Sequence, residues 1–121
     1  MHLQPFHVLA YRFSVLVDRA EIGHAYLYLI FNDRHKEPYG LLEDLYVDPD
    51  HRSHGIGTAL EEAVEHKARS LNCYKFVGTS RNDGTRTDVQ AWCERRGFER
   101  YGTEFRMDMH EVAACAEQQQ H

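Results

Sequence analysis

The chain has 121 residues and a mass of 14.2 kDa, which is the size of one ordinary domain. Apolar residues make up 42% of the chain and charged residues 27%, so the composition excludes low-complexity and disordered classes and allows a real core. Fourteen Lys and Arg against nineteen Asp and Glu give a net charge of -5, which argues against nucleic acid as a partner because a phosphate polymer would be repelled.

Membrane and secretory signals are missing from the sequence pattern. No stretch approaches the roughly 20 consecutive apolar residues that a membrane span needs, and residues 1–6 lack the basic start and apolar run of a signal peptide. The three cysteines, Cys73, Cys93 and Cys115, are odd in number and form no C-x-x-C pair. We therefore expect a cytoplasmic protein with free thiols and no membrane association.

The first part of the chain has the two-residue period of β-strands. Residues 7–17 alternate apolar and mixed side chains, and residues 22–31 are rich in β-favouring side chains, with the polar residues 18–21 between them. Residues 41–47 predict a third strand, which ends at Asp48-Pro49 because proline lacks the donor that a strand ladder needs. The pattern indicates an antiparallel meander.

The period changes after Gly55, where apolar residues recur every three or four positions and predict one long helix. Its apolar stripe is expected to hold Ile56, Ala59, Leu60, Ala63, Val64, Ala68 and Leu71, and its solvated side Glu61, Glu62, Glu65 and Arg69. A short strand over residues 74–79 follows. The order strand, helix, strand predicts that this strand pairs in parallel with the third one.

The remaining residues predict a second helix and two closing strands. After a polar loop at 80–85, the helix covers residues 88–96 and ends at Gly97, and the strands cover residues 98–101 and 104–109. The last eleven residues, with three consecutive glutamines, are typical of a frayed or disordered tail. We expect one α+β domain over residues 1–110, with a mixed, mostly antiparallel sheet and two main helices, and a C-terminal tail over residues 111–121.

The segment between the third strand and the long helix has the composition of an anion-binding turn. It carries Arg52, Gly55 and Gly57 directly before the helix. Glycines let backbone N–H groups approach a phosphate, a helix amino terminus supplies unpaired donors, and arginine binds phosphate in a fork. Two glycines alone are as often simple turn residues. The P-loop and the dinucleotide fold are disfavoured because the Gly-Lys-Ser/Thr ending and the third glycine are missing.

Two motifs in the correct order resemble the GNAT superfamily of acyl-CoA-dependent N-acetyltransferases. The phosphate loop of that family reads Arg/Gln-x-x-Gly-x-Gly/Ala, as residues 52–57 do, and residues 92–98 stand where the family has an aromatic-Tyr-Glu-x-x-Gly-Phe segment. Residues 42–49 are similar to the spermidine/spermine acetyltransferase branch. The resemblance covers about residues 40–109.

The resemblance implies a GNAT-like fold that transfers an acetyl group from acetyl-CoA to a primary amine by direct attack. The acceptor would be a small-molecule or peptide amine. The implied cofactor-binding positions are the backbone of Leu45, Tyr46 and Val47 for the pantetheine arm, and Arg52, Ser53, His54, Gly55, Ile56, Gly57 and Thr58 for the pyrophosphate. The alternatives are a non-catalytic acyl-CoA-binding regulatory module and a structural domain without a ligand.

Acetyl transfer requires a neutral amine, so a base or a water relay must take up its proton. Glu43 is the candidate base. It is expected to share a strand face with Leu41, Leu45 and Val47, a setting in which burial makes a carboxylate more basic. The alternative is that Glu43 pairs with an arginine at the sheet edge.

The departing thiolate benefits from an acid, and Cys93 stands where family members commonly carry tyrosine. A thiol can donate a proton to a thiolate of similar basicity. The alternatives are that Cys93 is a small apolar side chain and that Tyr74, Tyr101 or water serves as the acid.

The amino-terminal part is short for this family. Family members usually place two helices between the first and second strands, and only residues 18–21 lie there in this chain. We therefore expect either an open acceptor site or a homodimer in which a second copy completes it. His51 and His54, next to Asp48 and Asp50, give only a weak metal signal, so no metal is expected.

Overall fold

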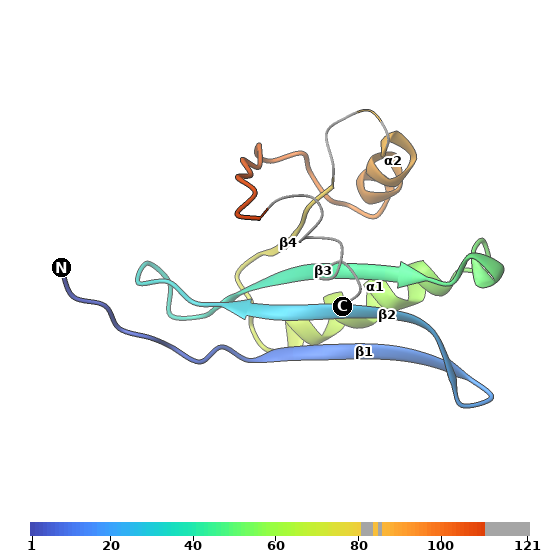
Figure 1. The fold of residues 1–121 in the computed structure, drawn as a ribbon, viewed down its shortest axis with the longest axis horizontal. Helices are drawn as coiled ribbons and strands as arrows, with labels where there is room; N and C mark the ends of the chain where they lie inside the picture. Colours follow the sequence, from blue (N-terminus) through green and yellow to red (C-terminus); the bar gives the residue numbers. More distant parts are fainter. Residues whose placement is uncertain (81–83, 85, 111–121) are drawn as a thin grey trace. The chain divides into compact units, whose positions relative to one another are not determined.

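A computed structural model describes residues 1–80, 84 and 86–110 of the chain (Figure 1). The predicted tail over residues 111–121, including Cys115, lies outside the described residues. The chain divides into two compact units, residues 1–79 and 80–121, and each is described by itself below. Within the described residues, no helix is both long and apolar enough to cross a membrane.

The first unit contains a four-stranded sheet with the order β1-β2-β3-β4. Its strands are β1 (Ala10–Val17), β2 (Ala20–Ile30), β3 (Tyr39–Val47) and β4 (Phe76–Gly78), and the three long ones lie side by side in Figure 1. The β1–β2 and β2–β3 pairs are antiparallel, and β3 pairs with β4 in parallel. The predicted meander and the predicted parallel pair are both confirmed.

A two-residue turn joins β1 to β2. Asp18 and Arg19 have φ values of 50° and 70°, and the flanking residues Val17 and Ala20 pair directly. Positive φ at both central residues matches the right-handed twist of the strands, which is why such turns are favoured in hairpins. The chain therefore passes from β1 to β2 without a helix.

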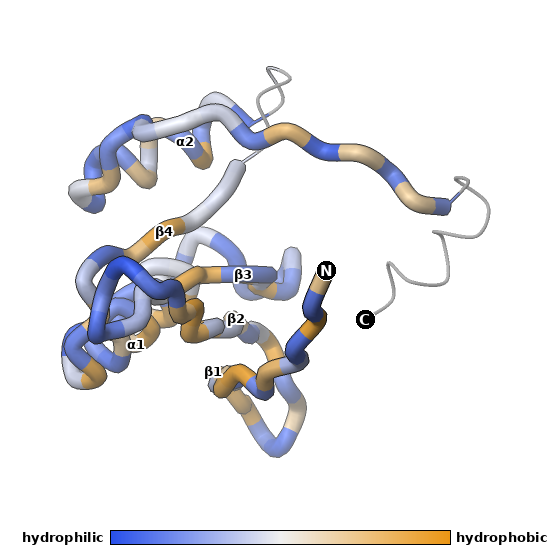
Figure 2. The backbone as a smooth tube through the Cα atoms, turned by 90° about the vertical axis from the view of Figure 1, so that its left-hand side faces the viewer, coloured by the Kyte–Doolittle hydropathy of each residue, from blue (hydrophilic) through white to orange (hydrophobic). Residues whose placement is uncertain are grey.

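Helix α1 (Ile56–Ser70) covers one face of this sheet. The core consists of buried residues from β2 and α1, namely Ala25, Leu27, Leu29, Leu60, Val64 and Ala68. Residues of β1 pack against the same cluster, and Figure 2 shows the hydrophobic stretch along that strand. A Cβ on Gly40 would lie 3.3 Å from the Ala68 Cβ, so a glycine permits the close approach of helix and sheet there.

The predicted apolar stripe of α1 is confirmed for Ile56, Leu60, Val64, Ala68 and Leu71, but not for its two remaining residues. Ala59 and Ala63 are exposed, whereas Glu61, expected on the solvated side, is completely buried. The helix turns the line of Leu60 and Val64 toward β2, and Glu61 lies on the flank of that line. Residue type alone favours a small apolar side chain over a carboxylate at a buried position, so the prediction misplaced Ala59, Ala63 and Glu61 at the flanks of the stripe.

The second unit contains α2 (Thr87–Arg95). Gly97, directly after the C-cap residue Arg96, has a φ of 102°, which confirms that a left-handed glycine ends the helix. The Phe98 amide donates to the Cys93 carbonyl at 3.0 Å and closes the last turn.

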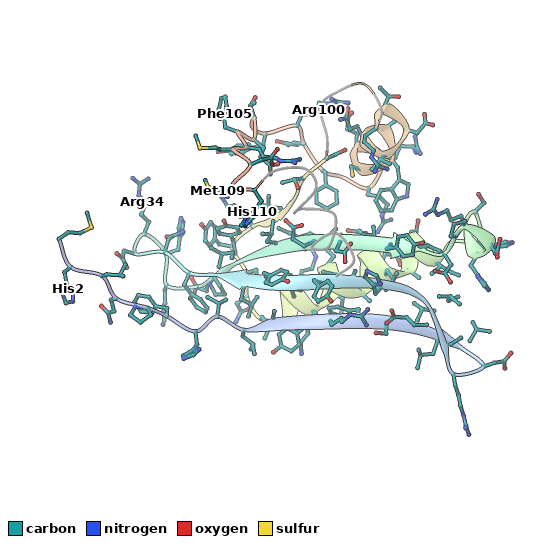
Figure 3. The ribbon with its side chains drawn as sticks, viewed as in Figure 1. His2, Arg34, Arg100, Phe105, Met109 and His110 are labelled. Atoms are coloured by element: carbon teal, nitrogen blue, oxygen red, sulfur yellow. The ribbon has the colours of Figure 1, made fainter. Side chains whose placement is uncertain are left out.

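The two predicted closing strands are wrong in the described residues. Residues 98–108 have no strand assignment, and Tyr101 and Phe105 are each 91% exposed. Figure 3 shows Phe105 and Met109 along this segment. The alternation of residues 104–109 has the period of a strand, but a strand also requires a neighbour to complete its hydrogen bonds.

Candidate functional site

A β-bulge interrupts β3 before its carboxyl end. Tyr26 pairs with Glu43 and His24 pairs with Tyr46, so Asp44 and Leu45 both lie opposite the single residue between Tyr26 and His24. Asp44 has a φ of 52°, in the left-handed region. Two residues opposing one is the definition of a bulge, which bends the strand and changes the direction of its side chains.

The bulge corrects the expected environment of Glu43. In an unbroken strand Glu43 would share a face with Leu45 and Val47, but these two side chains pack against the core under α1. Glu43 is paired with Tyr26, whose position in β2 alternates with the buried Leu27, so Glu43 lies on the opposite face and is half-buried.

The edge of β3 that faces β4 is paired over only part of its length. β4 pairs with Gly40, Leu41 and Leu42, and within the described part of the chain no strand borders the segment 43–47 on that side. An unpaired edge can hydrogen-bond an extended partner as another strand would. The predicted positions Leu45, Tyr46 and Val47 lie on this segment.

The loop after β3 is held against the end of the strand. A 3-10 turn, η1 (Pro49–His51), leads to Arg52, whose Nε donates to the Val47 carbonyl at 2.8 Å. The guanidinium carbon of Arg52 lies 5.6 Å from the centroid of the Tyr46 ring. Arg52 therefore places a positive charge at the carboxyl end of β3, close to the start of α1 in the sequence.

The amino terminus of α1 has the features of an anion-binding site. Its N-cap is Gly55, with a φ of 82° and no side-chain cap, and the first turn contains no acidic residue. A Cβ on Gly55 would meet nothing within 4 Å, and a Cβ on Gly57 would meet only Val47 Cγ2 at 3.8 Å. Ser53 and His54 are exposed beside it, Thr58 is half-buried, and the side chain of Ile56 packs on the core. The first N–H groups of a helix have no partner within the helix, so this terminus suits an anion.

The sheet face that carries Glu43 also holds a network of charged and aromatic side chains. Arg12 donates through Nε to Tyr26 Oη at 3.0 Å and through Nη2 to Glu21 Oε2 at 2.8 Å, with a second contact between Nη1 and Oε1. Hydrogen bonds from Arg12, and then that with Ser14, lower the pKa of Glu21 to about 2. This face is therefore polar and ordered by charge pairs.

The predicted catalytic pair falls into different units. Glu43 lies on β3 in the first unit, and Cys93 lies half-buried on α2 in the second. Of the alternative acids, Tyr74 accepts a hydrogen bond from Asn32 Nδ2 at 3.0 Å, and Tyr101 is 91% exposed. The joint role of Glu43 and Cys93 stays a prediction.

Sequence reasoning missed His24, which contacts the bulge from β2. Its Nε2 lies 2.9 Å from Asp44 Oδ2. No motif in the sequence points to His24, because the contact depends on the register between two strands. Among the described residues, no group of three His, Cys, Asp or Glu side chains is arranged to hold a metal ion.

The model of the acetyltransferase (GNAT) family matches residues 7–98. The chain belongs to this family. A curated relative, aminoglycoside N(6')-acetyltransferase type 1 of Stenotrophomonas maltophilia, is 37% identical over 70 residues, which cover 56% of this chain and 43% of that protein. The chain thus spans less than half the length of this relative.

Solved structures confirm the GNAT fold. An acetyltransferase of Trypanosoma brucei is 26% identical with a TM-score of 0.70, and the match covers 84% of this chain and 69% of that one. A putative acetyltransferase of Agrobacterium tumefaciens is 23% identical with a TM-score of 0.74, covering 83% and 69%. The acetyltransferase AAC(6')-Iy, solved with a bisubstrate analogue built on CoA, is 21% identical with a TM-score of 0.68, covering 84% and 69%.

Proposed function

We propose that this GNAT protein is an N-acetyltransferase that moves the acetyl group of acetyl-CoA to a primary amine by direct attack. One observation carries the proposal. The unpaired edge of β3 runs into a loop that ends at the uncapped amino terminus of α1, so an extended arm and an adjoining diphosphate would each find backbone partners in one continuous segment, residues 43–58.

The residues of this segment fit the parts of acetyl-CoA. The backbone of Leu45, Tyr46 and Val47 would hydrogen-bond the pantetheine arm, and the amides around Gly55 and Gly57 would hold the pyrophosphate. Backbone N–H groups along the same edge would stabilise the negative charge that develops on the thioester oxygen during attack. Arg52 adds a fixed positive charge at the junction of the two parts.

Glu43 is the proposed base or relay for the ammonium group of the acceptor. It is half-buried on the face opposite α1, and it pairs across the strands with Tyr26. A carboxylate on this face can attract a cationic amine and take up its proton. The name of the curated relative supports an amine acceptor, whereas the similarity to the spermidine/spermine branch lies in the cofactor-binding half and leaves the acceptor class open.

A second copy is proposed to complete the acceptor site. The tight turn between β1 and β2 supplies no helical wall for a pocket, and a homodimer would provide one. Sedimentation equilibrium tests this point, and a monomer that acetylates amines at full rate would contradict it.

The test of binding is a calorimetric titration with CoA and with pantetheine. We expect CoA to bind more tightly, because only CoA carries the diphosphate, and we expect Arg52→Ala to weaken CoA by about tenfold without weakening pantetheine equally. Equal affinities for the two ligands would contradict the pyrophosphate site.

The test of catalysis is thiol release over a panel of amines, including aminoglycosides, polyamines and peptides. Turnover on any acceptor supports the proposal, and Glu43→Gln should then lower kcat by about 100-fold or more. CoA binding without turnover on any acceptor would favour the second candidate, a regulatory acyl-CoA-binding module. The departure from tyrosine at Cys93 is the observation that motivates this candidate.

The proposed acid is tested by Cys93→Ala, with Cys73→Ala as the matched control because Cys73 packs on the core of the first unit. We expect only Cys93→Ala to lower kcat, by about tenfold or more. An unchanged kcat would assign the proton to water or to another group.

A further inference from the structure

His24 contacts Asp44, the left-handed residue of the bulge in β3, and Tyr46, the residue that follows the bulge. Its Nε2 lies 2.9 Å from Asp44 Oδ2, and its ring stacks on Tyr46 with centroids 5.6 Å apart and planes 28° from parallel. The side chain of His24 is only 17% exposed, although it lies on the face opposite α1. A single imidazole thus links β2 to the bulge on either side of Leu45.

Asp44 needs such a contact because its backbone is unfavourable. A φ of 52° brings the Cβ of an L-residue close to its own carbonyl group, and only glycine adopts this region without cost. Residues held in this region persist where surrounding contacts fix them. The contact with His24 is the interaction of the Asp44 side chain that can hold it there.

A second contact, at the other ring nitrogen, fixes the orientation of the His24 ring. Its Nδ1 lies 3.5 Å from Glu21 Oε2, and Glu21 is paired with Arg12 of β1. The groups that face the imidazole are therefore the carboxylates of Glu21 and Asp44 and the rings of Tyr26 and Tyr46. Both ring nitrogens have a carboxylate neighbour, so rotation of the ring would break at least one contact.

We propose that His24 is a positioning residue for the binding of the acetyl-CoA arm. By holding Asp44 in the left-handed conformation it maintains the bulge, and the bulge keeps the backbone of residues 45–47 in place at the unpaired edge of β3. Loss of the contact lets the segment relax toward an unbulged strand, in which the hydrogen-bonding groups of the edge shift by one residue. This inference rests on the proposed function, because the ligand of the edge is the one proposed above.

The experiment compares variants that remove the contact with variants that keep it. His24→Ala and Asp44→Ala remove it, whereas His24→Gln keeps a donor near the position of Nε2, and Asp44→Asn keeps an acceptor and tolerates positive φ. Asp44→Gly keeps the backbone freedom but loses the side chain. Asp18→Ala is the matched control, because Asp18 has a φ of 50° in the turn between β1 and β2.

We expect His24→Ala and Asp44→Ala to weaken CoA binding by about fivefold, the size expected for one partly solvated charged hydrogen bond. The KM for acetyl-CoA should rise by the same factor while kcat stays within about twofold. His24→Gln and Asp44→Asn should restore most of the affinity, and Asp44→Gly should lose less affinity than Asp44→Ala, because glycine adopts the positive φ without the contact. Asp18→Ala should lower Tm and leave CoA affinity unchanged.

Amide hydrogen exchange of residues 45–47 without ligand gives an independent measurement. We expect faster exchange in His24→Ala than in wild type and in Asp18→Ala. If the wild-type protein binds no CoA, the proposed function fails, while the exchange rates still test the contact. Unchanged exchange and affinity in His24→Ala would overturn the inference. So would a fall in kcat at constant KM, which would make His24 a catalytic residue, or an equal loss of CoA affinity in Asp18→Ala.

Discussion

A carboxylate placed at the start of α1 should stabilise the free protein and weaken CoA binding at the same time. Thr58 is the third residue of this helix, and the first turn contains no acidic side chain. The substitution Thr58→Glu adds a negative charge beside the helix amino terminus, where it interacts favourably with the helix dipole by about 0.3–1 kcal/mol. The same charge competes with the proposed pyrophosphate.

The size of the competition follows from Coulomb's law. With an effective dielectric constant of about 40, one charge about 6 Å from the two negative charges of a pyrophosphate costs roughly 2.8 kcal/mol. Screening at physiological ionic strength, with a Debye length of about 8 Å, reduces this to roughly 1.3 kcal/mol. We therefore expect about a tenfold loss of CoA affinity, which should shrink further as salt is added.

The neutral variant Thr58→Gln separates this charge effect from the loss of the hydroxyl group and from the change in size. Ala63→Glu adds the same charge at an exposed position further along the helix. Calorimetry with CoA and thermal unfolding without ligand are measured for all three variants. If Thr58→Glu binds CoA as tightly as Thr58→Gln, the pyrophosphate does not lie at this helix terminus and the assignment of the loop is refuted.

Three further predictions concern the framework around the site. Arg12 lowers the pKa of Glu21 from 4.5 to about 2, so the stability that this pair contributes is present above pH 4.5 and is lost as the pH falls toward 2. The urea midpoints of wild type and Glu21→Gln should therefore differ at pH 7 and converge near pH 2. Leu27→Ala should cost about 2–5 kcal/mol of unfolding free energy in urea, whereas Leu16→Ala, at a position 62% exposed, should change it by less than about 0.5 kcal/mol. Burial raises the pKa of the Cys73 thiol above 9.0, so iodoacetamide should alkylate Cys73 more slowly in the folded protein than in urea, and equal rates would contradict this.

Local periodicity was sufficient for the elements that form one continuous core. The alternation along β2 and the three- and four-residue steps of α1 each report a face that is covered by the other element, so both could be predicted from the periodicity of apolar residues. The glycines at positions 55 and 97 were also informative, because each has a positive φ at a helix boundary.

The predictions that were wrong in β3 concern features that depend on the pairing between strands. Asp44 looks like any polar residue in a strand, and only the register with β2 makes it the left-handed residue of a bulge. The predicted face of Glu43 was wrong for the same reason, since one additional residue in the strand reverses the alternation of side chains between the two faces. The burial of Glu61 was mispredicted for a different reason: the packing of α1 on the sheet also covers the flank of the apolar stripe, and residue type does not report how far that cover extends.

The bulge also decides from which side an acceptor can approach the proposed thioester. After the bulge, the side chains of Leu45 and Val47 pack against the apolar core beneath α1. Glu43 and Tyr46 lie on the other face, next to His24 and the charge pairs of β1. In the proposed reaction, a cationic amine would be drawn to the face that holds the candidate base, and the backbone between the two faces would bind the acyl donor. Under the proposed function, the bulge would let one strand bind both substrates, whereas an unbroken strand would place Glu43, Leu45 and Val47 on one face.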